Sequence, residues 1–325
     1  ISGFSCEKGT VESKEAMLDL VRERKAIMKE FPNLVTYEAL KAFQKRKDLD
    51  EMPAAGTPID DLEVKQTFWG QIQRTKIERP FERASEEVYA KRRRWRLGMP
   101  RVLNMYSTGP FWMAYFQGLG VDPRNIVWSD ESGEEMFAEG GKYGSVDPCY
   151  PSKVAQAHFH NLFFKHHEEK PLDAIFFPIL THVPCFIEHA VDHTSCPIVA
   201  GTPDVMKAAF TKEQDFFATR GIRYYDPSIS FVEKVRMKQV LFETFKDALD
   251  LTEDESNWAL DQATAALERF DQDVQAKGKA ILDQVEYENR VAILMIGRPY
   301  HLDPGLHHGI PDEFQVLGYP ILSIR

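Results

Sequence analysis

The residue whose surroundings best suit chemistry is Cys149. It lies in the segment Asp147-Pro-Cys-Tyr-Pro-Ser-Lys153, directly before a predicted helix that extends to about His167. Backbone amides at a helix start point toward whatever precedes them, and the helix dipole favours negative charge there. A thiolate is therefore stabilised at this position, which suits a metal ligand or a nucleophile. A structural cysteine buried in a loop is the alternative interpretation.

Two further cysteines lie at predicted element boundaries. Cys6 lies in a glycine-flanked turn, and Cys196 begins a predicted strand over residues 196–200. Each alone also fits a small buried hydrophobic side chain. Together with Cys149 they predict a shared thiolate site, because thiolates select iron–sulfur clusters or zinc. No Cys-x-x-Cys pair adds support from spacing, but we expect Cys149 and Cys196 to face a common crevice at one edge of the sheet.

A rival site combines a cysteine with two histidines. Cys185, His189 and His193 are four residues apart, so on a helix they share one face and form a candidate zinc site. The alternative interpretation is that these three residues lie along the partly exposed edge of a helix and bind no metal. His158 and His160 are only two residues apart on a predicted helix, so they face differently and predict no site.

The loop after a predicted strand at 290–296 holds candidate anion contacts. Ligands of open α/β sheets bind beyond the carboxyl ends of the strands, which makes Arg298 and His301 candidate cofactor- or substrate-binding residues. The chain has no phosphate-binding loop, no Gly-x-Gly-x-x-Gly after a strand and no Gly-x-Ser-x-Gly elbow. The sequence thus shows no self-contained active site.

These candidates require a scaffold, and the chain alternates predicted strands with predicted helices. We predict strands at residues 101–106, 125–128, 173–177, 196–200 and 223–225. Intervening helices include 111–120 and 133–139. The alternation predicts an α/β fold, a Rossmann-like and mostly parallel sheet with flanking helices.

The flanking regions complete a four-part division. We predict a helical N-terminal linker region (1–97), the Rossmann-like domain (98–230), a helical bridge (231–289) and the start of a second α/β lobe (290–325). In the bridge, Thr252 and Glu255 have the form of a capping box. Because the chain stops on a predicted strand at 320–324, we expect a piece of a longer polypeptide with its second lobe truncated.

Composition restricts the partners and the setting. The 50 acidic and 40 basic residues give a net charge of −10, whereas a nucleic-acid-binding protein needs a basic surface. The basic run Lys91–Arg94 predicts a solvated helix end or, alternatively, an anion or acidic-partner site. No apolar run approaches the ~20 residues of a membrane span. Only 4 cysteines occur, which favours a reducing, cytoplasmic setting over a disulfide framework.

Several motifs, in this order, resemble the uncharacterised domain of the large 2-hydroxyacyl-CoA dehydratase activases, the CoA-enzyme activase family. They are Pro100-Arg-Val-Leu-Asn-Met-Tyr106 with Pro110-Phe-Trp112, Cys149-Tyr-Pro-Ser-Lys153, Cys196-Pro-Ile-Val199 and Gly297-Arg-Pro-Tyr-His301. Ser2-Gly3 and Cys6-Glu-Lys-Gly9 resemble the segment that joins this domain to preceding ATPase modules. The resemblance covers essentially the whole chain.

The resemblance implies a function and a cofactor. Such polypeptides carry actin-like ATPase activator modules, then this domain, then a dehydratase-subunit-like region, and they couple ATP hydrolysis to single-electron transfer. The implied cofactor is a [4Fe-4S] cluster, with Cys149 and Cys196 as the first candidate ligands and Cys6 as the third. Relatives often place a cysteine where this chain has Ile179, so either Cys185 substitutes for it through a loop or the chain lacks a fourth ligand.

Two functional classes are therefore predicted. In the first, the domain carries an iron–sulfur cluster for electron transfer, works with the ATPase modules of its own polypeptide and serves a dehydratase-like acceptor. In the second, it is a cluster-free docking or scaffold domain that positions activator and acceptor. A zinc-binding domain is the third alternative, and the use of an acyl-CoA is left open.

Overall fold

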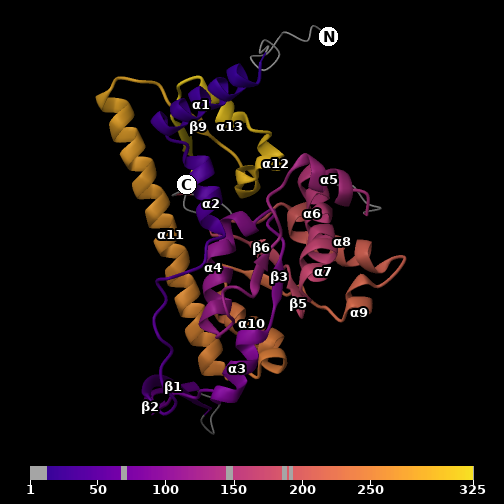
Figure 1. The fold of residues 1–325 in the computed structure, drawn as a ribbon. Coiled ribbons are helices and arrows are strands. Elements are labelled where there is room, and N and C mark those ends of the chain that lie inside the picture. The colour runs from indigo at the N-terminus through magenta and orange to yellow at the C-terminus, as the bar shows by residue number, and fades with distance from the viewer. Residues whose placement is uncertain (1–12, 67–71, 144–148, 185–188, 190–192, 325) are drawn as a thin grey trace.

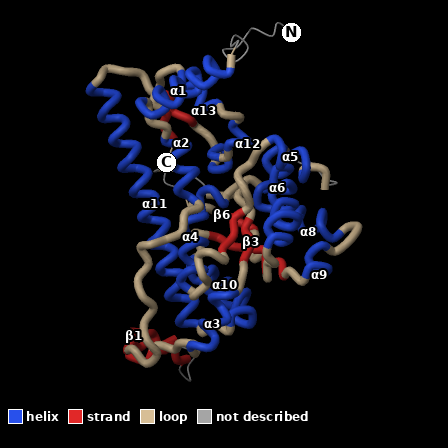
Figure 2. Tube along the Cα trace, viewed as in Figure 1, coloured by secondary structure: helices blue, strands red, loops and turns tan. Residues whose placement is uncertain are grey.

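A four-stranded parallel sheet lies at the centre of the molecule (Figures 1 and 2). The computed structural model describes residues 13–66, 72–143, 149–184, 189 and 193–324. In spatial order the strands are β4 (Ile126–Trp128), β3 (Leu97–Met99), β5 (Ala174–Phe176) and β7 (Arg223–Tyr225). All three pairings are parallel. After a short interruption, β5 and β7 are followed by a second parallel pair, β6 (Ile179–His182) and β8 (Ser228–Ser230). The predicted α/β fold with a parallel sheet and flanking helices is confirmed.

Helices make up most of the remaining structure. They are α1 (Lys14–Glu30), α2 (Leu34–Ala42), α3 (Glu86–Arg94), α4 (Met105–Gly118), α5 (Glu134–Gly140), α6 (Tyr150–Asn161), the π-helical turn η2 (Leu162–His166), α7 (His167–Glu169), α8 (Pro197–Thr211), α9 (Phe216–Arg220), α10 (Lys234–Leu249), α11 (Glu253–Tyr287), the 3-10 helix η3 (Pro299–Leu302), α12 (Pro304–His307) and α13 (Ile310–Val316). No helix in the described part of the chain is long and apolar enough to cross a membrane.

Helices cover both faces of the sheet with aromatic side chains. On one face, Trp112 of α4 packs on Phe176 of β5 with ring centroids 4.9 Å apart, and Phe245 of α10 packs on the same ring at 5.7 Å. On the other face, Phe159 of α6 contacts Tyr224 of β7 at 5.7 Å. The close approach depends on Gly98 of β3, because an added Cβ would lie 2.9 Å from the Leu172 side chain. Burial of both faces explains why β3, β4 and β5 are apolar throughout.

The 35-residue helix α11 runs along most of the length of the molecule (Figure 1). Its start is the predicted capping box. The Glu255 amide donates to the Thr252 hydroxyl at 3.2 Å, and the Thr252 amide donates to the Glu255 carboxylate at 3.1 Å. The two reciprocal hydrogen bonds satisfy two amides that the helix itself leaves unpaired.

The C-terminal segment forms a small α/β unit with the N-terminal helices. Strands β9 (Ile293–Met295) and β10 (Ile321–Ser323) pair in parallel. The Ile321 amide donates to the Pro32 carbonyl at 2.8 Å, just before α2. Arg24 of α1 pairs with Glu313 of α13 at 2.8 Å. Helices far apart in sequence thus cover this second sheet, while the predicted domain boundaries stay a prediction.

Two predicted strands are wrong. Residues 101–106 contain a turn, with Leu103 at φ +53°, and the first residues of α4, whereas the strand comes earlier, at β3. A short apolar run does not distinguish a strand from a helix that is buried all round, which α4 is. Residues 196–200 begin α8, because Pro197 occupies its first position, where a missing amide proton costs nothing.

The N-terminal region also differs from prediction. Residues expected to be helical or connective form an antiparallel hairpin of β1 (Pro58–Gln66) and β2 (Ile72–Pro80). Neither strand has a buried face, so the sequence lacks the alternation of apolar and polar residues that marks a half-buried strand. In the basic run, Lys91, Arg93 and Arg94 are exposed as expected, but Arg92 is only 1% exposed and belongs to the core.

Candidate functional site

Cys196 lies directly before α8, and the residue that precedes it, Ser195, is hydrogen-bonded on two sides. The Ser195 amide donates to the Thr181 carbonyl of β6 at 2.8 Å. Asn104, at the start of α4, donates from its side-chain amide to the Ser195 hydroxyl at 2.9 Å. Asn104 and Ser195 are both buried, so the residue before Cys196 is fixed relative to the sheet. The Cys196 thiol itself is half-buried and makes no hydrogen bond to its helix.

Cys149 occupies the equivalent position at the start of α6. Its carbonyl accepts from the Lys153 amide at 3.0 Å, and Pro151 lies in the first turn of the helix. Its thiol is also half-buried and makes no capping hydrogen bond. Both thiols therefore precede helices of 12 and 15 residues, whose amides and dipoles favour a negative group.

The starts of the two helices lie side by side. The Thr202 hydroxyl of α8 is hydrogen-bonded to the Ser152 hydroxyl of α6 at 3.0 Å, and both residues are buried. Each helix leads into the next parallel strand of the sheet, so each begins at the carboxyl edge of the strands. The helix starts that carry Cys149 and Cys196 thus lie at one edge of the sheet.

Tyr300 of η3 lies within electrostatic range of both cysteines. Burial raises the pKa of its phenol, proximity to Cys196 and Cys149 raises it further, and the Arg298 guanidinium opposes these effects. Three separate segments therefore converge here, the starts of α6 and α8 and the loop after β9.

Two of the other predicted ligands, Cys6 and Cys185, lie outside the described residues. Within the described ranges, no group of three or more His, Cys, Asp or Glu side chains is placed to hold a metal ion. For the rival zinc site, His189 has φ +62°, outside the right-handed helical region, so a helical spacing of its partners is not supported there. The cluster and zinc assignments both stay predictions.

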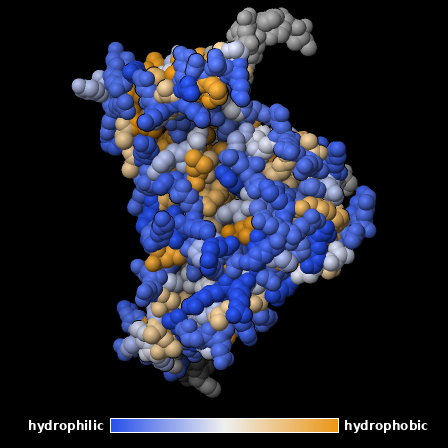
Figure 3. All heavy atoms as spheres, viewed as in Figure 1, coloured by the Kyte–Doolittle hydropathy of each residue, from blue (hydrophilic) through white to orange (hydrophobic). Residues whose placement is uncertain are grey.

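Arg298 and His301 line a cavity of about 420 Å³. It lies at the carboxyl ends of β6, β9 and β10, where ligands of open sheets bind. Figure 3 shows apolar surface in the recess between the C-terminal segment and the body of the molecule. The cavity wall is mainly apolar, with polar groups at His193, His307, Glu38 and Ser323. The His301 imidazole Nδ1 accepts from the Arg298 amide at 2.8 Å, which shapes the loop and leaves the exposed guanidinium facing solvent.

Beside this edge lies a buried series of hydrogen-bonded polar residues, which no sequence pattern predicted. Asp303 accepts from the Ser132 hydroxyl at 2.7 Å, and Ser132 contacts His158 Nε2 at 2.8 Å. His158 Nδ1 contacts the Ser129 hydroxyl at 2.7 Å. His158 was expected to form no site because His160 faces elsewhere, but its partners come from distant segments. The only local signal was a histidine on an otherwise apolar helix face.

The family of the chain follows from a comparison with protein-family models. Residues 96–325 match the model of the CoA enzyme activase uncharacterised domain. The chain belongs to this family. The match covers the central sheet, both described cysteines, α11 and the C-terminal unit, and it begins just before β3. No curated protein and no solved structure matches this activase-family domain.

Proposed function

We propose that this activase-family domain carries an iron–sulfur cluster for electron transfer, with Cys149 and Cys196 as two of its ligands. The observation that carries the proposal is the placement of two free thiols before two adjacent helices, at the carboxyl edge of a parallel sheet. Paired helix starts stabilise the negative charge of two thiolates and of the cluster that they would hold.

The donor set fits the cluster in part. Thiolates are the ligands that iron–sulfur clusters select, and two are present at the same edge. A [4Fe-4S] cluster takes up to four such ligands, so further thiolates are needed, and Cys6 and Cys185 are the remaining cysteines of the chain. Ile179, at the start of β6, has no metal-binding atom. When bound, the cluster would accept and release single electrons.

The surrounding residues would tune and cover this site. Tyr300 places a half-buried phenol within electrostatic range of both cysteines. The neighbouring cavity, with Arg298 and His301 at its wall, would receive an organic anion such as an acyl-CoA or its product. The partners in this proposal are ATPase activator modules of the same polypeptide as electron source and a dehydratase-like acceptor.

Anaerobic reconstitution with iron and sulfide tests the proposal. The parent chain should develop broad visible charge-transfer absorption and bind about four irons per chain. Cys149→Ser and Cys196→Ser should each abolish the absorption, because serine keeps the size but lacks the soft thiolate. Cys185→Ser should have a smaller effect, because the two thiolates at the helix starts remain in place. A colourless parent protein, or a Cys149→Ser variant that binds iron as the parent does, would contradict the assignment.

The hairpin favours docking as a second candidate function. In the described structure, β1 and β2 pair only with each other, and isolated two-stranded hairpins are marginally stable. One face exposes Leu62 (53%), Val64 (60%) and Ile72 (66%) beside Arg74 and Lys76. Such apolar surface suits contact with another module. If reconstitution fails, a Leu62→Gln, Ile72→Gln double variant should weaken binding to the purified ATPase modules, whereas unchanged binding would argue against docking through this face.

A further inference from the structure

A buried polar chain joins the C-terminal segment to the central sheet. Asp303, between η3 and α12, is 0% exposed, and His158 of α6 is also 0% exposed. Ser132 and Ser129, both from the loop after β4, connect them with hydrogen bonds of 2.7–2.8 Å. Asp303 thus hydrogen-bonds residues 298–308 to the sheet side of the molecule, where the Tyr150 hydroxyl of α6 also donates to the Gly305 carbonyl at 3.5 Å.

The direction of the hydrogen bonds follows from the donors available. The Ser132 hydroxyl donates to Asp303, so its oxygen accepts from His158 Nε2–H. The Arg101 amide donates to Ser129 at 2.8 Å, which leaves the Ser129 hydroxyl to donate to His158 Nδ1. His158 is therefore neutral, and burial lowers its pKa to about 3, with the charge of Arg101 acting in the same direction. A histidine in this state is not a general base for Ser132, so the chain is not a catalytic pair.

Among the described residues no cation forms a salt bridge with Asp303, although the charge of Arg101 lowers its pKa. The nearest guanidinium, that of Arg101, pairs with Glu131 at 3.3 Å. The other titratable groups that face Asp303 are the Glu131 carboxylate, the Tyr106 phenol and His158, and none of them neutralises a carboxylate. Burial raises the pKa of Asp303 from 3.8 to about 6, although the Ser132 hydroxyl and the Gly305 amide lower it.

Protonation leaves the contacts intact. A neutral carboxyl group donates to Ser132 through one oxygen and still accepts from the Gly305 amide, now 2.8 Å away, through the other. Reversal of the Ser132 hydroxyl and of the His158 tautomer preserves the remaining hydrogen bonds. The neutral form therefore keeps the closed arrangement without the cost of a buried charge.

The segment that Asp303 anchors also covers the candidate site. Tyr300 lies close enough to both cysteines for their charges to affect its pKa, and Arg298 lines the cavity. At the other end, the His308 ring stacks on Tyr150, the first residue of α6, with centroids 6.0 Å apart. Movement of residues 298–308 would uncover the cysteine edge and the cavity together.

We propose that the Ser132–Asp303 contact is a proton-linked latch, which closes residues 298–308 over the cysteine edge when Asp303 is protonated and releases them when it is ionised. An open segment exposes Asp303 to water, where the carboxylate is no longer penalised. The closed form therefore binds the proton more tightly, and closure weakens as pH rises toward and through 6. The latch does not depend on a bound cluster, so its test is independent of the electron-transfer proposal.

Hydrogen exchange of the metal-free chain measures the latch directly. The amides of Leu306 and His307 donate to the Asp303 carbonyl within the segment, and their exchange reports on how firmly the residues around Asp303 are held. After correction for the intrinsic exchange rate, protection of the 298–308 peptide should fall about tenfold between pH 5 and pH 8, since one pKa unit is tenfold in an equilibrium. Asp303→Asn, which mimics the neutral carboxyl, should keep the high protection at both pH values.

Two further variants separate the latch from general loosening. Ser132→Ala removes the partner on the sheet side and should lower protection of the same peptide at both pH values. Asp215→Asn, at an exposed helix cap on α9, should leave the parent pH profile unchanged. A parent profile that is flat from pH 5 to pH 8, or an Asp303→Asn profile with the parent slope, would overturn the proposal.

Discussion

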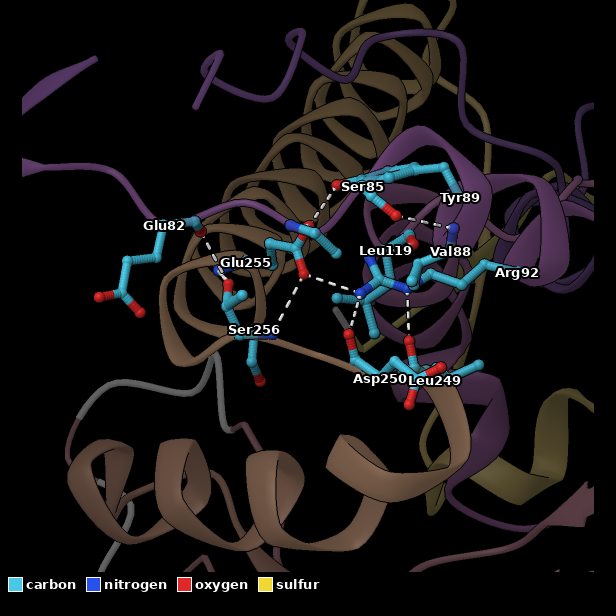
Figure 4. A network of polar contacts seen from close by, with 12 residues as sticks. Glu82, Ser85, Val88, Tyr89, Arg92, Leu119, Leu249, Asp250, Glu255 and Ser256 are labelled. Atoms are coloured by element: carbon cyan, nitrogen blue, oxygen red, sulfur yellow. Dashed lines mark hydrogen bonds and ion pairs between the residues drawn. The ribbon is translucent and has the colours of Figure 1, made fainter. Parts of the chain in front are cut away.

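Two buried carboxylates in this molecule have pKa values that are shifted in opposite directions. Glu255, at the start of α11, is 0% exposed and lies 2.8 Å from the guanidinium of Arg92, which is 1% exposed (Figure 4). Asp303 is equally buried but is held only by neutral donors. Burial pushes the pKa of Glu255 upward, yet the hydrogen bond and charge of Arg92 outweigh it and leave the pKa lowered. For Asp303 burial prevails.

The two pKa shifts differ because the two carboxylates have different hydrogen-bond donors around them. Arg92 also donates to the Leu249 carbonyl at 2.6 Å and the Asp250 carbonyl at 2.7 Å, and Tyr89 donates to Glu255 at 2.8 Å. This network ties together α3, the end of α10 and the start of α11, and it holds one charge state across the ordinary pH range. The Asp303 chain exists in two charge states near neutral pH. The Arg92–Glu255 network suits a permanent contact between helices, whereas the Asp303 hydrogen bonds suit a contact that opens.

The largest expected effect is on the Arg92 network. Arg92→Met leaves the Glu255 carboxylate buried without its cation, which should lower the free energy of unfolding by about 3–5 kcal/mol. Urea denaturation at pH 7 measures this. Arg93→Met, at the exposed neighbouring position, is the matched control and should change stability by less than about 0.5 kcal/mol. Equal losses of stability in the two variants would show that the buried Arg92 contributes no more than an exposed arginine.

A smaller effect of opposite sign is expected at Asp303. Its pKa is raised in the folded state, so the ionised carboxylate costs stability, and that cost appears as pH rises from about 4 through 6. Asp303→Asn should therefore raise the free energy of unfolding at pH 8 by about 1–3 kcal/mol and give little gain at pH 4. Denaturation curves at the two pH values test the sign. A variant that is less stable than the parent at pH 8 would show that the ionised form is not penalised.

The smallest effect is expected between the two cysteine-bearing helices. Thr202→Val removes the hydroxyl that links α8 to Ser152 of α6 but keeps the shape, which should cost about 0.5–1.5 kcal/mol. Thr211→Val, at the exposed end of the same helix, removes only a hydrogen bond to the Lys207 carbonyl and should cost less. Thermal unfolding of the two variants compares them. If Thr211→Val proves the more damaging, the link between the helix starts contributes little.

Local sequence chemistry determined several elements of this protein. Thr252 and Glu255 specified the start of α11, because a capping box needs only residues three apart. Strand β7 was predicted with its observed bounds, since turn residues and a helix end isolate a short apolar run there. The position of Cys149 before a helix was likewise legible, because Pro151 marks the first turn.

Only the tertiary structure decided the rest, since the deciding contacts join residues far apart in the chain. Ser132 and Asp303 are separated by 171 positions, and Arg92 and Glu255 by 163, so neither pair leaves a local pattern. Cys196 looked like the start of a strand because Ile198 and Val199 have β-branched side chains. It precedes a helix instead, because packing of α8 against α6 outweighs a weak intrinsic preference. The sequence supplied the thiols and the carboxylate, and the fold determined which of them lie together and which charge is left without a partner.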